Sequence, residues 1–193
     1  MWNKKKYIII IIALSVLIIG GIIIAGSYYH SNQRKDVPKS SMNVKTSRKE
    51  LEEINKFLVE KDEERIRSFV RRRDWNMDRT GSGLWYTIYE NSDGPNVKDG
   101  DYVKLDYEIR LLDGTLCYTS DSTGAKIFRV GETEEVTGLH EGLKLLSKGD
   151  KARFIIPPHL AHGLLGDSER IPARAILVYD LTVQEVSKEK ISP

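Results

Sequence analysis

The chain of 193 residues has room for one domain with short appendages. Residues 1–35 hold five of the 30 Lys and Arg residues and none of the 28 Asp and Glu residues. The remainder therefore carries 25 basic and 28 acidic residues, a balance that gives nucleic-acid binding no electrostatic support. Cys117 is the single cysteine, which excludes an internal disulfide, and no histidine and acid can be assigned to it as catalytic partners.

The N-terminal segment predicts a membrane anchor. Residues 7–25 are uncharged and rich in isoleucine. As a helix they would extend about 28 Å, enough to span the hydrocarbon core of a bilayer. Lys4, Lys5 and Lys6 precede this run, which favours an N-terminus inside the cytoplasmic membrane and a C-terminal domain outside it, in the periplasm. Residues 1–29 are thus assigned to a cytoplasmic tip and a single-pass transmembrane helix.

A cleaved signal peptide is the alternative, because the small residues Ala25, Gly26 and Ser27 follow the apolar run. The domain would then be exported without its anchor. The run is longer than a typical signal-peptide core, which favours an uncleaved anchor. A lipoprotein signal is excluded, since it needs a cysteine at the cleavage site.

Residues 30–45 are polar and unpatterned, as is typical of a linker. An amphipathic, charged helix is predicted over residues 46–75, opened by a capping box of Ser47 and Glu50. The apolar residues at near-helical spacing are Leu51, Ile54, Leu58, Ile66, Phe69 and Val70. We expect the charged face to be solvated, with contact to anionic lipid or a partner as the alternative. The apolar stripe requires burial, either on the following domain or in a homodimer.

From Gly83 onward the pattern changes to β-strands around one short helix. The predicted strands cover residues 84–89, 102–112, 116–118, 151–156 and 175–186, and the predicted helix covers residues 137–147. Asp113-Gly114 marks a hairpin turn. Many antiparallel strands around one short helix indicate an α+β fold.

The loop after the strand 151–156 is unusually apolar. Pro157 ends the strand, because proline cannot donate a hydrogen bond to a sheet. The loop then mixes His159 and His162 with leucines and small residues. Such a loop beside a strand end indicates one wall of an apolar pocket, and a loop folded over its own core is the alternative.

Residues 99–186 resemble the FKBP-type peptidyl-prolyl isomerases in the order and spacing of several short motifs. These motifs are Gly100-Asp101-Tyr102-Val103, Leu112-Asp113-Gly114, Phe128-Arg129-Val130-Gly131, Val136-Thr137-Gly138-Leu139-His140-Glu141-Gly142-Leu143, Gly149-Asp150-Lys151-Ala152, Ile171-Pro172 and Leu177-Val178-Tyr179-Asp180-Leu181. The resemblance implies a half-wrapped antiparallel sheet over one short helix, in agreement with the strand pattern. It sets an isomerase domain at residues 83–188 with its core at 99–186.

The region before this domain resembles the membrane-attached subgroup associated with gliding motility in Bacteroidetes-type bacteria. The similar motifs are Arg72-Arg73-Asp74-Trp75 and Gly83-Leu84-Trp85-Tyr86. Members of that subgroup are lipid-anchored, whereas this chain lacks the necessary cysteine.

The family resemblance implies a shallow apolar pocket, between sheet and helix, that grips the proline ring of a peptide. The catalytic positions that it implies are Tyr107, Phe128, Val136, Leu139, His162, Ile171 and Tyr179, and the further substrate-binding positions are Cys117, Tyr118 and Leu160. Leu139 would form the pocket floor and Ile171 would overhang it. The Val136 N–H or His162 would bind a substrate carbonyl.

Cys117-Tyr118 stands where the family carries Phe-Asp. Neighbouring residues in a strand face opposite sides of the sheet, so we expect Tyr118 not to replace the missing phenylalanine. The change predicts weaker binding of the family's macrolide inhibitors and lower catalytic efficiency.

The resulting prediction is a peptidyl-prolyl isomerase, without cofactor or metal, that assists the folding of exported proteins at the outer face of the cytoplasmic membrane. Its partners would be proline-containing polypeptides. A weakly catalytic or non-catalytic chaperone module for the same segments is the alternative. A metal site at His140, His159 and His162 is a third reading, although their spacing matches no firm metal motif.

Overall fold

The computed structural model describes residues 48–132 and 135–192, and Glu52–Pro193 forms one compact unit. The predicted transmembrane segment at residues 7–25 and the linker at 30–45 lie outside the described residues. Within the described ranges, every helix is too short or too polar to cross a bilayer.

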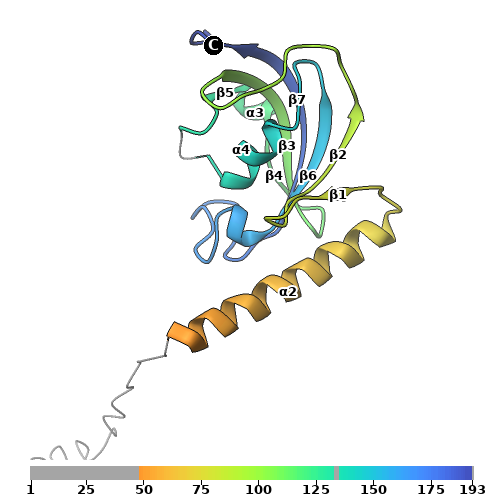
Figure 1. Cartoon of the computed structure of the whole chain (residues 1–193), viewed down its shortest axis with the longest axis vertical. Helices are drawn as coiled ribbons and strands as arrows, with labels where there is room; N and C mark the ends of the chain where they lie inside the picture. The colour runs from red at the N-terminus through yellow and green to blue at the C-terminus, as the bar shows by residue number, and fades with distance from the viewer. Residues whose placement is uncertain (1–47, 133–134, 193) are drawn as a thin grey trace, which may run out of the picture. The chain divides into compact units, whose positions relative to one another are not determined.

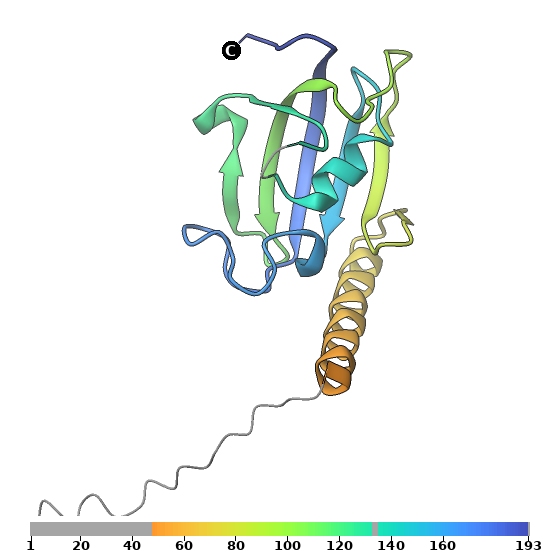
Figure 2. The same cartoon turned by 60° about the vertical axis from the view of Figure 1, so that its left-hand side comes forward.

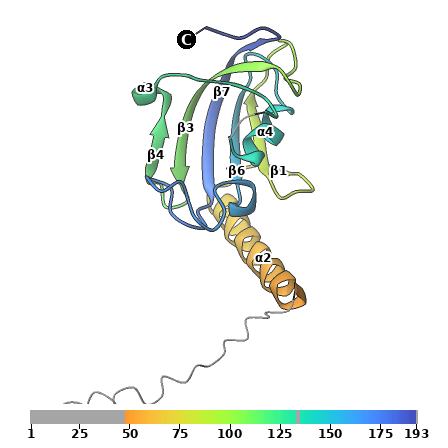
Figure 3. The same cartoon turned by 90° about the vertical axis from the view of Figure 1, so that its left-hand side faces the viewer.

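One seven-stranded antiparallel sheet dominates the fold, with the strand order β1-β2-β6-β7-β3-β4 and with β5 also paired to β3 (Figure 1). The strands are β1 Asp78–Arg79, β2 Trp85–Glu90, β3 Tyr102–Leu111, β4 Leu116–Thr119, β5 Lys126–Arg129, β6 Lys151–Ile156 and β7 Leu177–Ser187. The helices are α2 Arg48–Arg72, α3 Ser120–Thr123 and α4 Thr137–Leu143, with a 3-10 helix, η1, at Pro158–Leu160. β5 and β4 pair with successive parts of β3, so both lie along the same edge of that strand. Figure 3 shows β4 beside β3.

The two faces of the sheet bury two different apolar clusters. Alternation along β6 and β7 sends Phe154 and Tyr179 to the inner face, and Ile155 and Val178 to the outer face. On the inner face, α4 crosses the sheet (Figure 2) and its fully buried Leu139 joins the main core. The outer-face cluster is the one that receives α2.

The predicted α+β class, an antiparallel sheet over one short helix, is confirmed, with corrections in detail. β6 has the predicted bounds, and it ends directly before Pro157. The helix predicted at residues 137–147 ends earlier, at Leu143, because the chain turns and Ser147 then forms a β-bridge with Asn96. The four-residue strand β5 was not predicted, since so short a run shows little periodicity.

Only the second half of α2 packs on the domain. Ile66, Phe69 and Val70 are buried against a patch formed by Ile155, Ile176 and Val178. Leu51 and Ile54, from the start of the predicted stripe, are each 51% exposed. The structure therefore shows packing on the chain's own domain for one half of the helix and leaves the other half uncovered.

Two glycines allow α4 to lie directly on β6. A Cβ added at Gly142 would be 2.5 Å from the Phe154 ring, and one added at Gly138 would be 2.5 Å from the Ile156 side chain. Such distances force a neighbouring group to move, and both neighbours are fully buried.

Substitution Gly142→Ala is expected to lower the free energy of unfolding by about 1–3 kcal/mol, since overpacking outweighs the helix propensity of alanine. Gly81→Ala is the matched control, because a Cβ there meets nothing within 4 Å. Chemical denaturation of both variants measures the difference. Equal stability of the two variants would contradict the close packing of α4.

Candidate active site

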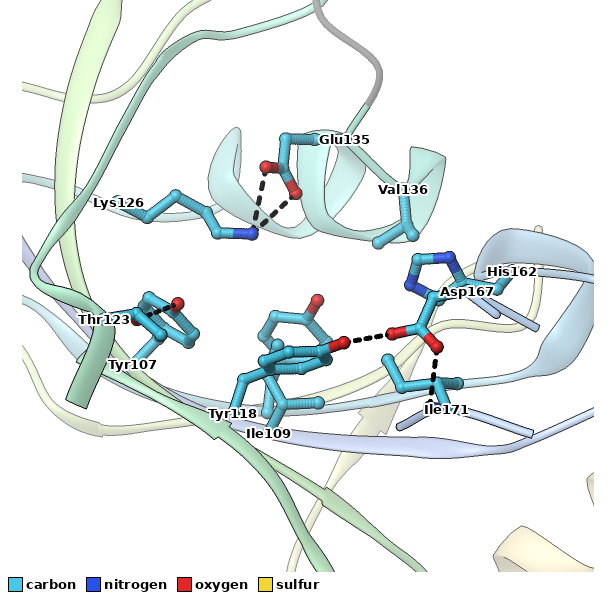
Figure 4. Close-up of a pocket in the computed structure, with 11 residues that line it drawn as sticks. Tyr107, Ile109, Tyr118, Thr123, Lys126, Glu135, Val136, His162, Asp167 and Ile171 are labelled. Carbon is cyan, nitrogen blue, oxygen red and sulfur yellow. Dashed lines mark hydrogen bonds and ion pairs between the residues drawn. The ribbon is translucent and has the colours of Figure 1, made fainter. Parts of the chain in front are cut away.

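A cavity of about 590 Å³ opens on the inner face of the sheet (Figure 4). Its lining residues are Tyr107, Ile109, Tyr118, Thr123, Lys126, Glu135, Val136, His162, Asp167, Ile171 and Tyr179. They come from β3, β4, α3, β5 and β7, from the segment that enters α4, and from the loop that follows η1. The cavity therefore brings together residues that are up to 72 positions apart in the sequence.

The floor of the cavity depends on the pairing of β3 with β7. Ile109 lies directly opposite Tyr179 in this pairing, so both side chains point to the same face. Tyr179 is only 2% exposed, and burial raises the pKa of its phenol well above the ordinary value. Tyr107, two residues before Ile109, shares a hydrogen bond of 2.7 Å with the Thr123 hydroxyl. The floor is thus aromatic and apolar, with the hydroxyl of Tyr107 already partnered.

An ion pair forms one polar wall. Lys126 Nζ lies 2.9 Å from a carboxylate oxygen of Glu135, and both side chains are 24% exposed. The same ammonium group lies 5.2 Å from the centre of the Tyr107 ring. This contact joins β5 to the residue that precedes Val136 and α4 (Figure 4).

Asp167 organises the opposite wall. One of its carboxylate oxygens accepts hydrogen bonds from the backbone N–H groups of Glu169, Arg170 and Ile171, at 2.8 to 3.0 Å. The other oxygen accepts from the Tyr118 hydroxyl at 2.5 Å. Burial opposes ionisation of Asp167, but these four hydrogen bonds outweigh it and lower the pKa of Asp167 to about 2. The same contact raises the pKa of the Tyr118 phenol well above its ordinary value.

The expectation that Tyr118 would not replace the missing phenylalanine at the cavity is wrong for a specific reason. Ile109 pairs with Tyr118 and Arg110 pairs with Leu116, so Cys117 is an extra residue in a β-bulge. The bulge breaks the alternation of β4. Tyr118 consequently faces the cavity with Ile109, while Cys117 is 1% exposed and belongs to the main core. Burial also raises the pKa of the Cys117 thiol.

Comparison with known proteins identifies the domain. Residues 94–184 match the sequence profile of the FKBP-type peptidyl-prolyl cis-trans isomerase family. This domain belongs to the FKBP family.

Two bacterial relatives extend the match beyond the domain. The probable FKBP-type isomerase FkpA of Neisseria meningitidis serogroup B is 28% identical over 86% of this chain and 56% of that protein. A probable FKBP-type isomerase of Haemophilus influenzae is 31% identical over 75% of this chain and 58% of that protein. The chain thus spans little more than half the length of these relatives.

The crystal structure of a peptidyl-prolyl isomerase from Pseudomonas syringae pv. tomato has the same fold. Its TM-score is 0.56 at 24% identity, with 67% of this chain and 96% of that chain covered.

Four positions that the FKBP resemblance implied as site residues do not line the cavity: Phe128, Leu139, Leu160 and Cys117. Phe128 lies two residues beyond Lys126 on β5, so its ring is farther along the strand, where it packs edge-on against His140. Leu139 is fully buried within the core beneath α4. Leu160 lies against the first turn of α4, where its carbonyl accepts a hydrogen bond from Thr137. Phe128, Leu139 and Cys117 belong to the main core, and Leu160 packs against that core.

Five lining residues were missed by sequence reasoning: Ile109, Thr123, Lys126, Glu135 and Asp167. Ile109 follows from the alternation of β3 with Tyr107. The other four depend on how loops and short elements close around the cavity, which has no periodic signal.

The three histidines considered for a metal site do not form one. Across residues 48–132 and 135–192, no three His, Cys, Asp or Glu side chains are placed to hold a metal ion together. The His140 ring accepts a hydrogen bond from the Gly131 N–H, and the His159 ring donates one to the Ser82 carbonyl. His162 alone faces the FKBP cavity.

Substitution Asp167→Asn is expected to lower the free energy of unfolding at pH 7 by about 2 kcal/mol, because the carboxylate accepts four hydrogen bonds. The folded pKa of about 2 lies below the ordinary value of 3.8, so this stabilisation is complete above pH 4 and is lost as the pH falls toward 2. The gap between wild type and variant should therefore shrink over that range in denaturation curves. Glu90→Gln, in an exposed ion pair with Lys151, is the control that should show neither effect.

Proposed function

We propose that this protein catalyses cis–trans isomerisation of X–Pro peptide bonds in polypeptides. The observation that carries the proposal is the aromatic and apolar floor formed by Tyr107, Ile109 and Tyr179, with Val136 and Ile171 also in the cavity lining. Membership of the domain in the FKBP family supports the same activity. A cavity of about 590 Å³ has room for a proline ring and its neighbouring residues.

The reaction requires no nucleophile. Rotation about an X–Pro bond must break amide resonance, which sets a barrier of about 18–20 kcal/mol. The planar amide is stabilised by water more than the twisted amide, because its charge separation is larger. An apolar cavity withdraws that water and so favours the twisted state. Tyr179 and Ile171, which are 2% and 3% exposed, supply such an environment.

A hydrogen-bond donor at the rim would hold the substrate carbonyl while the bond rotates. Val136, directly before the first turn of α4, and His162 both line the cavity on the same side (Figure 4). We assign the carbonyl contact to the Val136 N–H and the His162 ring. The Tyr118 hydroxyl already donates a hydrogen bond to Asp167, so we do not assign it the contact with the substrate carbonyl.

Protein comprising residues 48–193 is expected to accelerate isomerisation of a proline tetrapeptide above the rate in buffer. His162→Phe should lower kcat/KM by about five- to ten-fold, because one hydrogen bond to the substrate is lost. His162→Tyr, which keeps a donor, should retain most of the activity. His159 lies outside the cavity, so His159→Gln serves as the control and should leave kcat/KM unchanged. No acceleration by the wild-type protein would refute the proposed activity.

A chaperone that binds unfolded segments is the second candidate. The observation that favours it is an exposed apolar surface on α2 and on the loop after η1, where Phe57, Leu164 and Leu165 are 61%, 67% and 86% exposed. In this case Leu164→Ser with Leu165→Ser should weaken suppression of aggregation of a denatured client. Isomerisation of the tetrapeptide should stay unchanged. If both activities fall together, the exposed leucines are not a separate binding surface.

We further propose that the protein acts at the outer face of the cytoplasmic membrane on exported proteins. The apolar run at residues 7–25 and the lysines before it support this location. The resemblance of residues 72–75 and 83–86 to gliding-motility-associated members supports a location at the membrane, although those members are attached by lipid. Protection of the domain from protease in intact spheroplasts would contradict an outward orientation.

Dimerisation through α2 is proposed for the part of the helix that the domain leaves uncovered. Ile54 and Phe57 are 51% and 61% exposed there, and burial against a second copy would remove this apolar surface from water. A monomeric mass by light scattering at micromolar concentration would exclude this arrangement.

A further inference from the structure

A buried carboxylate links α2 to the cavity loop. Asp62 is 4% exposed, and its Oδ2 accepts a hydrogen bond from Arg174 Nη2 at 2.6 Å. Its other oxygen lies 3.5 Å from Arg65 Nη1. One turn farther along α2, Ile66 already docks the helix on the sheet through apolar contacts. Asp62 is buried, while the Arg174 side chain is 31% exposed. A partly buried ion pair adds little net stability compared with apolar residues of similar volume, so docking of the helix does not by itself explain this pair.

Arg174 closes the base of the loop that forms one wall of the cavity. Its backbone N–H donates to the Gly163 carbonyl at 2.9 Å, which joins the two ends of the segment 163–174. Its φ is +58°, in the left-handed region, where residues other than glycine stay only when their surroundings hold them. The contact of its guanidinium group with Asp62 stabilises Arg174 in this backbone conformation.

The same loop carries Asp167 and Ile171 into the cavity. The Asp167 N–H donates to the Ile171 carbonyl at 3.1 Å, so the loop is folded back on itself. A Cβ at Gly166 would be 2.2 Å from the Ile171 carbonyl oxygen, which shows how closely the two sides of the loop approach. Arg174 lies only three residues from Ile171 in this closely packed loop, so we expect a displacement of Arg174 to move Ile171 as well.

The loop is thus held from two sides. On the β4 side, Tyr118 donates to Asp167 and the Cys117 carbonyl accepts from Arg170 at 2.9 Å. On the α2 side, Asp62 accepts from Arg174. We propose that Asp62 and Arg174 are positioning residues for the isomerase reaction, through which α2 sets the placement of Ile171 and Asp167 in the cavity wall. This inference rests on the function proposed above, and it makes the affinity of the cavity for substrate depend on the docking of α2.

The proposal is tested in the full chain with Asp62→Ala, Arg174→Asn and the double variant. Asparagine suits position 174 because it tolerates a left-handed backbone. Each single change should raise KM for a proline tetrapeptide about five-fold with a smaller change in kcat, and the double variant should be no worse than the worse single variant. Arg174→Lys, which keeps the charge, should restore much of the affinity.

Glu63→Gln is the matched control, because Glu63 is the next residue on α2 and pairs with Arg79 of β1 at 3.1 Å instead of with the loop. It should leave KM unchanged. A loss of thermal stability in the Asp62 and Arg174 variants without any change in KM would assign the pair a structural role only and overturn the proposal.

A second measurement separates this proposal from the proposed function. The NMR signals of the Tyr118 ring and of the Ile171 backbone N–H, recorded at neutral pH in the absence of substrate, report two contacts of Asp167. Asp62→Ala and Arg174→Asn should shift both signals, while Glu63→Gln should leave them in place. If the wild type lacks isomerase activity, the function fails, but these two signals still decide whether α2 positions the loop.

Discussion

The pairing of β3 with β7 is the constraint on which the rest of the structure depends. Its register places Ile109 opposite Tyr179 and Tyr107 opposite Leu181, so that one face of two long strands carries a continuous apolar and aromatic surface. This surface forms much of the main core. Tyr107, Ile109 and Tyr179 belong to that core and also line the cavity, where they form its floor. Core and site thus share one face of the sheet.

The walls of the cavity are polar, and each polar contact joins two elements that the sheet itself does not hold together. Lys126 and Glu135 connect β5 to the segment entering α4, while Tyr118 and Asp167 connect β4 to the loop after η1. Both contacts are partly buried, so they are screened by solvent less than surface ion pairs. They give the apolar floor a fixed rim.

Helix α2 extends this arrangement to the outer face of the sheet. Phe69 and its apolar neighbours dock the helix, and the Asp62–Arg174 ion pair reaches around to the loop that forms the cavity wall. An element outside the FKBP domain therefore contacts the same loop that lines the cavity. If the proposed function is right, the N-terminal region can influence the site through this contact, in addition to its predicted role in attaching the protein to the membrane.

The sequence by itself determined the fold class and part of the cavity floor, because alternation in residues 102–112 is a local pattern that predicts which side chains share a face. It put Tyr107 on one face with Ile109, while Tyr179 was implied by the family resemblance. Only the tertiary structure decided the position of Tyr118, because a single bulged residue, Cys117, reverses the facing that alternation predicts. It also decided the roles of Lys126, Asp167 and Asp62. Their partners lie 9, 49 and 112 positions away in the sequence, and a contact at such separation depends on loop closure and has no periodic signal.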